Sequence, residues 1–200
     1  MDLKDFWNKR YSEDGFAYGL HPNDFLAAQF HLLKPQGKIL CLSEGEGRNA
    51  FFLASKGFHV TAVDLSEVGM AKLKERAIQE NMQIETIVSD LAVFDIGENK
   101  WDGIISIFAH LPPDLRKFVH AGVEKGLKLD GLFLLEAYRP EQITFGTGGP
   151  PSVDMMMSQQ TLSQELPHLK CELIMEIERD IHEGNYHNGR SAVVQFMGRK

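Results

Sequence analysis

The sequence predicts an α/β protein built on a mostly parallel sheet, and two features of the chain support this prediction. Short apolar runs alternate with stretches of helical periodicity over residues 38–137, which requires parallel strands joined by right-handed crossovers. After Tyr138 this rhythm changes, because the segment 184–189 joins two β-like runs and is too short for a crossover helix. We therefore expect a mostly parallel sheet closed by one antiparallel edge strand.

The individual elements follow from residue type and spacing. Residues 1–22 predict a short helix and an irregular arm, whose aromatic side chains should pack on the rest of the chain. Pro22 marks the expected start of a second helix, since apolar residues recur after it at helical spacing as far as Leu33. The predicted strands are 38–42, 58–64, 84–88, 101–108, 131–137, 171–179 and 191–197, and the other predicted helices are 48–55, 66–81, 113–127 and 158–166.

Composition limits the possible partners. The chain has 200 residues, of which 43% are hydrophobic and 24% charged, as in globular proteins. Its net charge of −7 disfavours nucleic acid or an anionic membrane as the main partner. The polar N-terminus and the lack of a long apolar run favour a cytoplasmic location. Cys41 and Cys171 lie in apolar runs, so both are expected to be buried, with neither a disulfide framework nor a metal site.

The segment 39–50, ILCLSEGEGRNA, is the centre of the functional argument. It predicts a strand, a tight turn and a helix N-terminus, where glycines let a ligand approach and exposed amides donate hydrogen bonds. The spacing of Gly45, Gly47 and Ala50, with Asp64 ending the next strand, matches a loose dinucleotide-binding pattern. A NAD-dependent dehydrogenase is therefore one alternative.

The charges of this segment favour a different cofactor. Glu44 and Glu46 flank the first glycine and would repel a pyrophosphate. S-adenosylmethionine has no phosphate; its sulfonium and amino groups suit acidic residues, and its carboxylate suits amides or Arg48. Asp64 suits a ribose hydroxyl and Asp90 an adenine amino group, since both acids end strands whose carboxyl ends share one crevice.

The whole chain resembles the class I S-adenosylmethionine-dependent methyltransferases. It is most similar to the bacterial branch that includes the tellurite-resistance methyltransferases and, more remotely, the thiopurine methyltransferases. The resemblance implies a Rossmann-like, doubly wound, seven-stranded sheet with an antiparallel last strand. It also implies a single methyltransferase domain, with residues 1–35 as a cofactor-capping arm and helix and 36–200 as the core. The matching residues are 7–11, 18–19, 22–23, 44–50, 63–66, 90–91 and 101–102.

The resemblance also implies a set of cofactor contacts. Glu44 and the two glycines should border the methionine portion, Asp64 the ribose, and Asp90 with its neighbour the adenine. Many relatives read Asp-Leu-Gly-Cys-Gly where this chain reads Cys-Leu-Ser-Glu-Gly, so we hypothesise that Glu44 replaces the missing strand-end acid. The predicted cofactor-binding residues are Tyr18, Glu44, Gly45, Gly47, Arg48, Asn49, Asp64, Leu65, Asp90, Leu91 and Ile107.

Methyl transfer needs few catalytic groups, because the sulfonium is already an activated leaving group. Positioning and water exclusion supply much of the catalysis, and a thiolate or selenide needs no protein base, whereas an alcohol or amine does. His110 is the catalytic candidate, as a base or a substrate hydrogen-bond partner, with a structural contact as the alternative. Tyr138 and Arg139 are candidates for the substrate side. His182 and His187 show no recognisable metal-ligand spacing.

The sequence therefore predicts an S-adenosylmethionine-dependent enzyme that methylates a small molecule, such as a thiol, a chalcogen compound or a similar acceptor. A cofactor-binding module without catalysis is the main alternative, and the dehydrogenase is less favoured. No Asn-Pro-Pro-Tyr sequence follows the fourth predicted strand, which disfavours methylation of flipped nucleic-acid bases. The glycine-rich segment 146–151 is expected to be either a lid or a plain surface connection.

Overall fold

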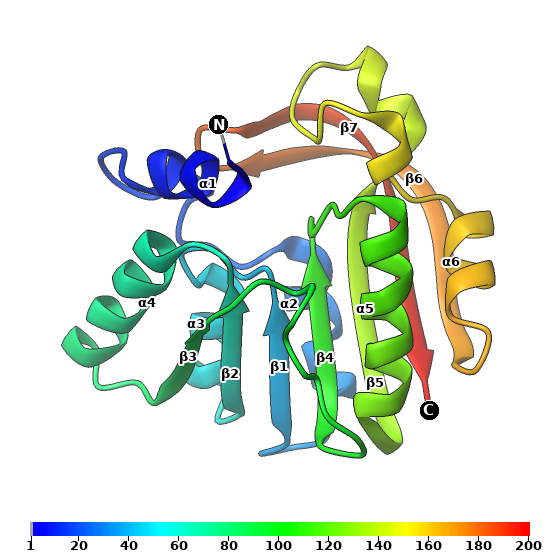
Figure 1. Cartoon of the computed structure of the whole chain (residues 1–200), viewed down its shortest axis with the longest axis horizontal. Helices are drawn as coiled ribbons and strands as arrows, with labels where there is room; N and C mark the ends of the chain where they lie inside the picture. The colour runs from blue at the N-terminus through cyan, green and yellow to red at the C-terminus, as the bar shows by residue number, and fades with distance from the viewer. Residues whose placement is uncertain (1) are drawn as a thin grey trace.

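A computed structural model describes residues 2–200 and shows a seven-stranded sheet with the order β3-β2-β1-β4-β5-β7-β6 (Figure 1). The strands are β1 (Lys38–Leu42), β2 (His59–Asp64), β3 (Ile84–Val88), β4 (Trp101–Ile107), β5 (Leu127–Tyr138), β6 (Lys170–Glu183) and β7 (His187–Arg199). The helices are α1 (Leu3–Tyr11), α2 (Asp24–Gln29), α3 (Arg48–Ser55), α4 (Glu67–Gln79), α5 (Pro113–Gly126) and α6 (Gln159–Glu165), with short 3₁₀ turns η1 (Phe30–Leu32), η2 (Pro140–Thr144) and η3 (Val153–Met155).

Helices cover both faces of the sheet, which confirms the doubly wound arrangement. One core packs residues of α2, α3 and α4 against the sheet, among them Leu26, Leu53 and Leu73. The other core packs α5 and α6 against the opposite face through Val123 and Leu162. The central strand β4 is buried at every position and mostly apolar, because helices cover both faces of the sheet there.

The parallel strands β1, β2, β3, β4 and β5 bring their carboxyl ends to one edge of the sheet. Leu42 pairs with Val63 in β2 and with Ser106 in β4, so the loops after these three strands begin at the same level. This edge is where open α/β sheets bind ligands.

The last strand is antiparallel, as predicted, but it does not lie at the edge of the sheet. β7 inserts between β5 and β6, and it is antiparallel to both of them. The two strands are longer than the periodicity indicated, because their turn is confined to residues 184–186. Figure 1 shows the ends of β6 and β7 passing above the central strands toward α1, and Asn185 N–H donates to Ala17 O at 2.8 Å.

Two local expectations were wrong. Cys171 is exposed, because it lies on the edge strand β6, whereas Cys41 is buried as predicted. The helix after Pro22 is also shorter than predicted, since α2 ends at Gln29 and gives way to the 3₁₀ turn η1.

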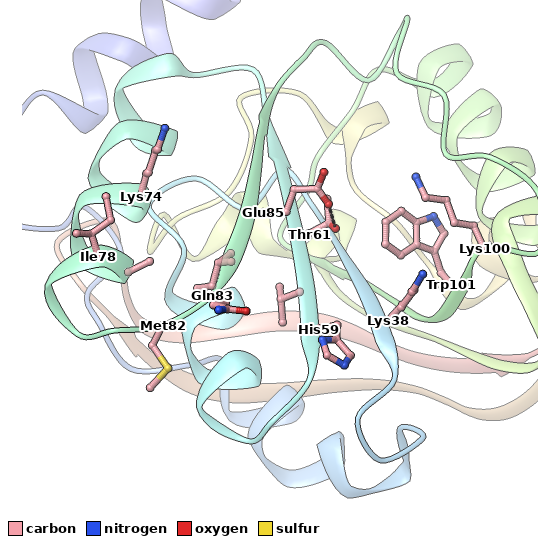
Figure 2. Close-up of a pocket in the computed structure, with 13 residues that line it drawn as sticks. Lys38, His59, Thr61, Lys74, Ile78, Met82, Gln83, Glu85, Lys100 and Trp101 are labelled. Carbon is pink, nitrogen blue, oxygen red and sulfur yellow. Dashed lines mark hydrogen bonds between the residues drawn. The ribbon is translucent and has the colours of Figure 1, made fainter.

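A hollow of about 520 Å³ lies at the opposite end of the sheet from the ligand-binding edge, over the amino-terminal ends of β2 and β3 (Figure 2). Residues 89–100 connect β3 to β4 without a helix, so no helix of this crossover covers the hollow. Lys74 lies on one side and Lys100 on the other, and the hydrogen bond drawn joins Thr61 to Glu85 at 2.7 Å. Its charged groups do not point toward one another, so the hollow is a poor candidate for a binding site.

Among residues 2–200, no helix is long and apolar enough to span a membrane.

A buried polar network fixes the N-terminal arm to the sheet. The side-chain amide of Asn23 donates to Glu136 on β5 at 3.1 Å and to Glu183 on β6 at 3.0 Å. Its oxygen also accepts from Leu26 N–H at 3.1 Å, which caps α2. Arg179 contacts the same oxygen of Glu136, Oε1, and Arg48 contacts the other oxygen of Glu183, Oε2, each at 2.6 Å.

We expect Asn23→Ala to lower the free energy of unfolding by about 2–4 kcal/mol, because it removes a helix cap and leaves two buried carboxylates short of a donor. Urea denaturation followed by circular dichroism measures this change. Gln164→Ala, which removes an exposed amide from α6, is the control and should stay within about 0.5 kcal/mol of the unmodified protein. A loss below about 1 kcal/mol for Asn23→Ala would contradict the role assigned to this network.

Candidate functional site

The loop between β1 and α3 is held in a conformation that needs glycine. Gly45 and Gly47 have φ of 63° and 86°, and Ser43 adopts the same left-handed region at 49°. A side chain at Gly47 would collide with Leu73 of α4, and a Cβ at Gly45 would lie 2.5 Å from the Tyr11 hydroxyl. The glycines therefore let the loop pass beneath α1 and α4, and they leave its other side open.

A carboxylate occupies the N-terminus of α3. Glu44 Oε1 accepts from the backbone N–H of Asn49 at 2.9 Å and of Ala50 at 2.7 Å. Burial raises the pKa of Glu44 to about 7, although these two amides and Arg48 oppose the shift. The donors that would hold a phosphate in a dinucleotide site are thus already used by the protein itself.

The second loop acid, Glu46, has a different role from the one its position suggested. Its carboxylate accepts from Ala17 N–H at 2.7 Å and from Lys72 Nζ at 2.8 Å. The ion pair with Lys72 compensates its charge, so Glu46 mainly fastens the N-terminal arm to α4. Glu44 therefore excludes a phosphate mainly by occupying the amides of α3, and Glu46 contributes little because Lys72 compensates its charge.

Asp64 connects the end of β2 to the glycine loop. Its two oxygens accept from Gly45 N–H at 2.9 Å and from Ser66 N–H at 2.8 Å. Burial raises its pKa, and the backbone donors oppose this shift. Asp90, after β3, is exposed and accepts from Ala92 N–H at 2.8 Å, which turns the chain back toward the same crevice.

Most of the predicted residues line one cavity of about 620 Å³. The roles assigned to them stay predictions, but the fold does bring them together. Gly45 does not line the cavity. The predicted residues on its walls are Tyr18, Glu44, Gly47, Arg48, Asn49, Asp64, Leu65, Asp90, Leu91, Ile107 and His110.

His110 lies in the cavity, but one of its ring nitrogens is already occupied. Tyr138 N–H donates to Nε2 at 2.9 Å, so the neutral ring carries its proton on Nδ1. Burial, reinforced by the nearby His187, lowers the pKa of His110 to about 3. Of the two functional roles expected for His110, hydrogen-bond partner and general base, this arrangement favours the hydrogen-bond partner.

The two substrate-side candidates on β5 and just after it do not line the cavity. Tyr138 is fully buried and stacks on Phe108, with ring centroids 4.6 Å apart, so it supports the cavity wall from behind. The Arg139 guanidinium turns away and pairs with Glu176 at 3.0 Å and Glu141 at 3.5 Å. Arg139 therefore does not reach the cavity, because Glu176 of β6 and Glu141 of η2 hold its guanidinium, and the sequence does not indicate the position of β6.

Apart from Tyr18, the sequence argument missed the aromatic half of the cavity. Its residues come from α1 and the arm, from the end of β4 and from the β6–β7 turn, and they are Phe6, Trp7, Tyr11, Tyr18, Phe108, Tyr186 and His187. The aromatic richness of residues 1–22 was the available signal. Phe108, with φ of 54°, is a strained residue of the kind that occurs at functional sites.

The cavity suits a cationic adenosine-containing ligand. Carboxylates of Glu44, Asp64 and Asp90 lie on its walls, and aromatic rings of α1 and the arm stand near them. Arg48, the one cation of the glycine loop, is paired with Glu183 at 2.6 Å in a buried contact. The residues present therefore fit S-adenosylmethionine better than a pyrophosphate.

Comparison with protein families gives the same assignment. Residues 39–131 match the family described as "Methyltransferase domain". The Haemophilus influenzae protein described as "Probable S-adenosyl-L-methionine-dependent methyltransferase TehB" is 33% identical over 103 residues. This match covers 52% of the chain and only 33% of the relative, so the chain matches about one third of that protein's length.

Solved structures share the fold across nearly the whole chain. The crystal structure of TehB from Haemophilus influenzae has a TM-score of 0.73 and 21% identity, covering 98% of this chain and 66% of that one. A structure from work on conversion of a disulfide bond into a thioacetal group during echinomycin biosynthesis has a TM-score of 0.77 and 16% identity, covering 99% and 93%. The resemblance to class I S-adenosylmethionine-dependent methyltransferases is confirmed, and the family match supports an enzyme with this cofactor.

The raised pKa of Glu44 predicts a pH-dependent stability. An unfolded glutamate ionises near pH 4.5, but Glu44 in the fold stays protonated up to about pH 7. Its contribution is therefore fully present below pH 4.5 and is lost as the pH rises to about 7, a change of up to about 3 kcal/mol. We expect Glu44→Gln to gain stability relative to the unmodified protein between pH 5 and 7.5.

Urea denaturation at several pH values measures this difference. Glu98→Gln, which alters an exposed carboxyl group, should keep the pH dependence of the unmodified protein. Parallel curves for Glu44→Gln and the unmodified protein would show that Glu44 ionises normally in the fold.

Proposed function

We propose that this chain catalyses methyl transfer from S-adenosylmethionine to a small-molecule acceptor of the thiol, chalcogen or similar class. The observation that carries the proposal is the carboxylate of Glu44, which fills the N-terminus of α3 at the wall of a cavity that also contains Asp64 and Asp90. Glu44 disfavours a phosphate because it occupies the amides of α3, and the acids Asp64 and Asp90 favour a cationic ligand. The methyltransferase-domain match over residues 39–131 supports the same activity.

In this proposal the acidic half of the cavity binds the cofactor. Asp64 contacts the ribose, Asp90 and Leu91 the adenine, and the Glu44 region the methionine portion, while Tyr18 covers the ligand from the arm. The cofactor supplies an electrophilic methyl group on a sulfonium. The task of the protein is then to orient the acceptor and exclude water, and the packed arm and hairpin suit that task.

The acceptor side of the cavity favours a small molecule. The segment 148–151 and Tyr186 of the β6–β7 turn also line the cavity, so loops cover part of it. Thr147 O accepts from Asn188 N–H at 3.1 Å, which ties the segment to the hairpin. The net charge of −7 also makes nucleic acid an unfavourable acceptor.

Isothermal titration calorimetry with S-adenosylmethionine, S-adenosylhomocysteine and NADH tests the cofactor. We expect both sulfur compounds to bind and NADH to give no heat, and the reverse result would overturn the proposal. Binding without turnover of any acceptor would support a cofactor-binding module, an alternative kept open by Cys41, which replaces the acid that many relatives carry at the end of this strand.

We expect Asp64→Asn to raise the Kd for S-adenosylhomocysteine at least about tenfold, equivalent to about 1.4 kcal/mol, because a ribose contact is lost. Asp95→Asn is a matched control, since Asp95 also accepts a backbone N–H in a turn, at 2.9 Å, but does not line the cavity. Calorimetry on both variants, after a melting-temperature check, gives the comparison. Equal affinities for the two variants would remove Asp64 from the cofactor site.

A further inference from the structure

We infer that His187, oriented by Glu183, is the catalytic base of this site, and that the acceptor is therefore a thiol that arrives with its proton. This inference rests on the proposed function and deepens it. The two residues face each other across the last hairpin, at the end of β6 and the start of β7. His187 lines the same cavity as Glu44 and Asp64, at its aromatic end.

The contacts of Glu183 determine which ring nitrogen of His187 is free. Glu183 Oε2 lies 3.2 Å from His187 Nδ1 and accepts from Arg48 Nη2 at 2.6 Å. These partners lower the pKa of Glu183 to about 2, so it is ionised and can only accept. His187 must therefore carry its proton on Nδ1, and Nε2 presents a lone pair. No residue from 2 to 200 forms a hydrogen bond with Nε2.

The ring of His187 is held in place by aromatic neighbours. Its centroid lies 4.5 Å from that of Tyr18, 4.8 Å from Phe108 and 5.3 Å from Tyr138. Burial lowers the pKa of His187 and outweighs the opposite effect of Glu183, so the ring is neutral at neutral pH. The other charged or titratable groups around it are Arg10, Arg48 and His110.

A neutral, fixed imidazole with a free lone pair suits the removal of a proton from the acceptor. The thiol sulfur forms a bond to the methyl carbon as the bond between that carbon and the sulfonium sulfur breaks. The electron pair of the broken bond stays on the cofactor sulfur, and the thiol proton passes to Nε2 of His187. Glu183 stabilises the imidazolium that results, and water later removes the proton.

The state of the arginines in the cavity favours a thiol over an oxyanion as the acceptor. The arginines and lysines that line it are Arg10 and Arg48, and both are engaged. Arg10 stacks on Tyr186 at 3.6 Å and donates to the Tyr18 hydroxyl at 3.1 Å, while Arg48 is paired with Glu183. An oxyanion such as selenite would find no unpaired cation here, whereas an apolar thiol finds aromatic walls and a proton acceptor.

Two thiols that differ in their degree of ionisation show whether His187 acts as a base or only binds the acceptor, because only the protonated thiol needs a base. The alkyl thiol 2-mercaptoethanol is mainly protonated at neutral pH, whereas the electron-poor aryl thiol 4-nitrothiophenol is mainly ionised. We expect His187→Asn and His187→Gln to lower kcat/KM for the alkyl thiol about 100-fold, the usual scale of general-base catalysis, and to change that for the aryl thiol by less than about threefold. S-adenosylhomocysteine affinity, measured by calorimetry, should stay unchanged.

His182 provides the matched control, because it lies in the same hairpin but is exposed and contacts Asn188. His182→Asn and His182→Gln should leave both rates unchanged. Equal losses with the two thiols, or no loss in the His187 variants, would overturn the assignment. Methylation of selenite but of neither thiol would also overturn it while leaving the proposed function intact, whereas failure to bind the cofactor would contradict the proposed function itself.

Glu183 is a positioning residue in this inference, and its variant has a distinct readout. We expect Glu183→Gln to move the acidic limb of the kcat/KM profile for the alkyl thiol to lower pH. The reason is that the ionised Glu183 favours the charged form of His187 and raises its pKa. A fall in rate with no shift of this limb would indicate that Glu183 supports only the fold.

Discussion

The two hydrogen bonds from Asn23 to Glu136 and Glu183 are the interaction on which the rest of the structure depends. Two buried carboxylates so close together would repel each other strongly in a medium of low dielectric constant. The amide of Asn23 lies between them, and Arg179 and Arg48 neutralise them from outside. The network joins the arm, the sheet and the last hairpin. Because the arm and the hairpin both line the cavity, its walls are complete only when all three are in place.

The cavity that results has two chemically different halves. The half beside the glycine loop is acidic, because Glu44, Asp64 and Asp90 end or follow neighbouring parallel strands. The other half is aromatic and holds His187, whose free nitrogen stands among Tyr18 and Phe108. A cationic methyl donor and a neutral acceptor would each meet the surroundings that suit them, and exclusion of water strengthens both interactions.

Local sequence signals predicted structure correctly where one helix or strand and its own caps determine it. α3 begins and ends where its residues predicted, and Ser66 caps α4 by accepting from Gly69 N–H at 3.1 Å. The gathering of most of the cofactor-side residues around one cavity was also predictable, because parallel topology alone brings strand ends together. The substrate side was less predictable. Arg139 faces away because its partner Glu176 lies on β6, and His187, dismissed as a metal ligand, reaches the cavity through a hairpin longer than its periodicity indicated.

The sequence by itself determined the doubly wound sheet, the glycine loop and the acids around it, because apolar periodicity and strand-end residues act over short stretches of chain. Only the tertiary structure decided which charges are free to act. Glu46 is neutralised by Lys72, Arg48 by Glu183, and the N-terminus of α3 by Glu44. Pairings such as those of Glu46 and Arg48 join residues tens to more than a hundred positions apart, and a buried charge takes whichever partner the packing places beside it.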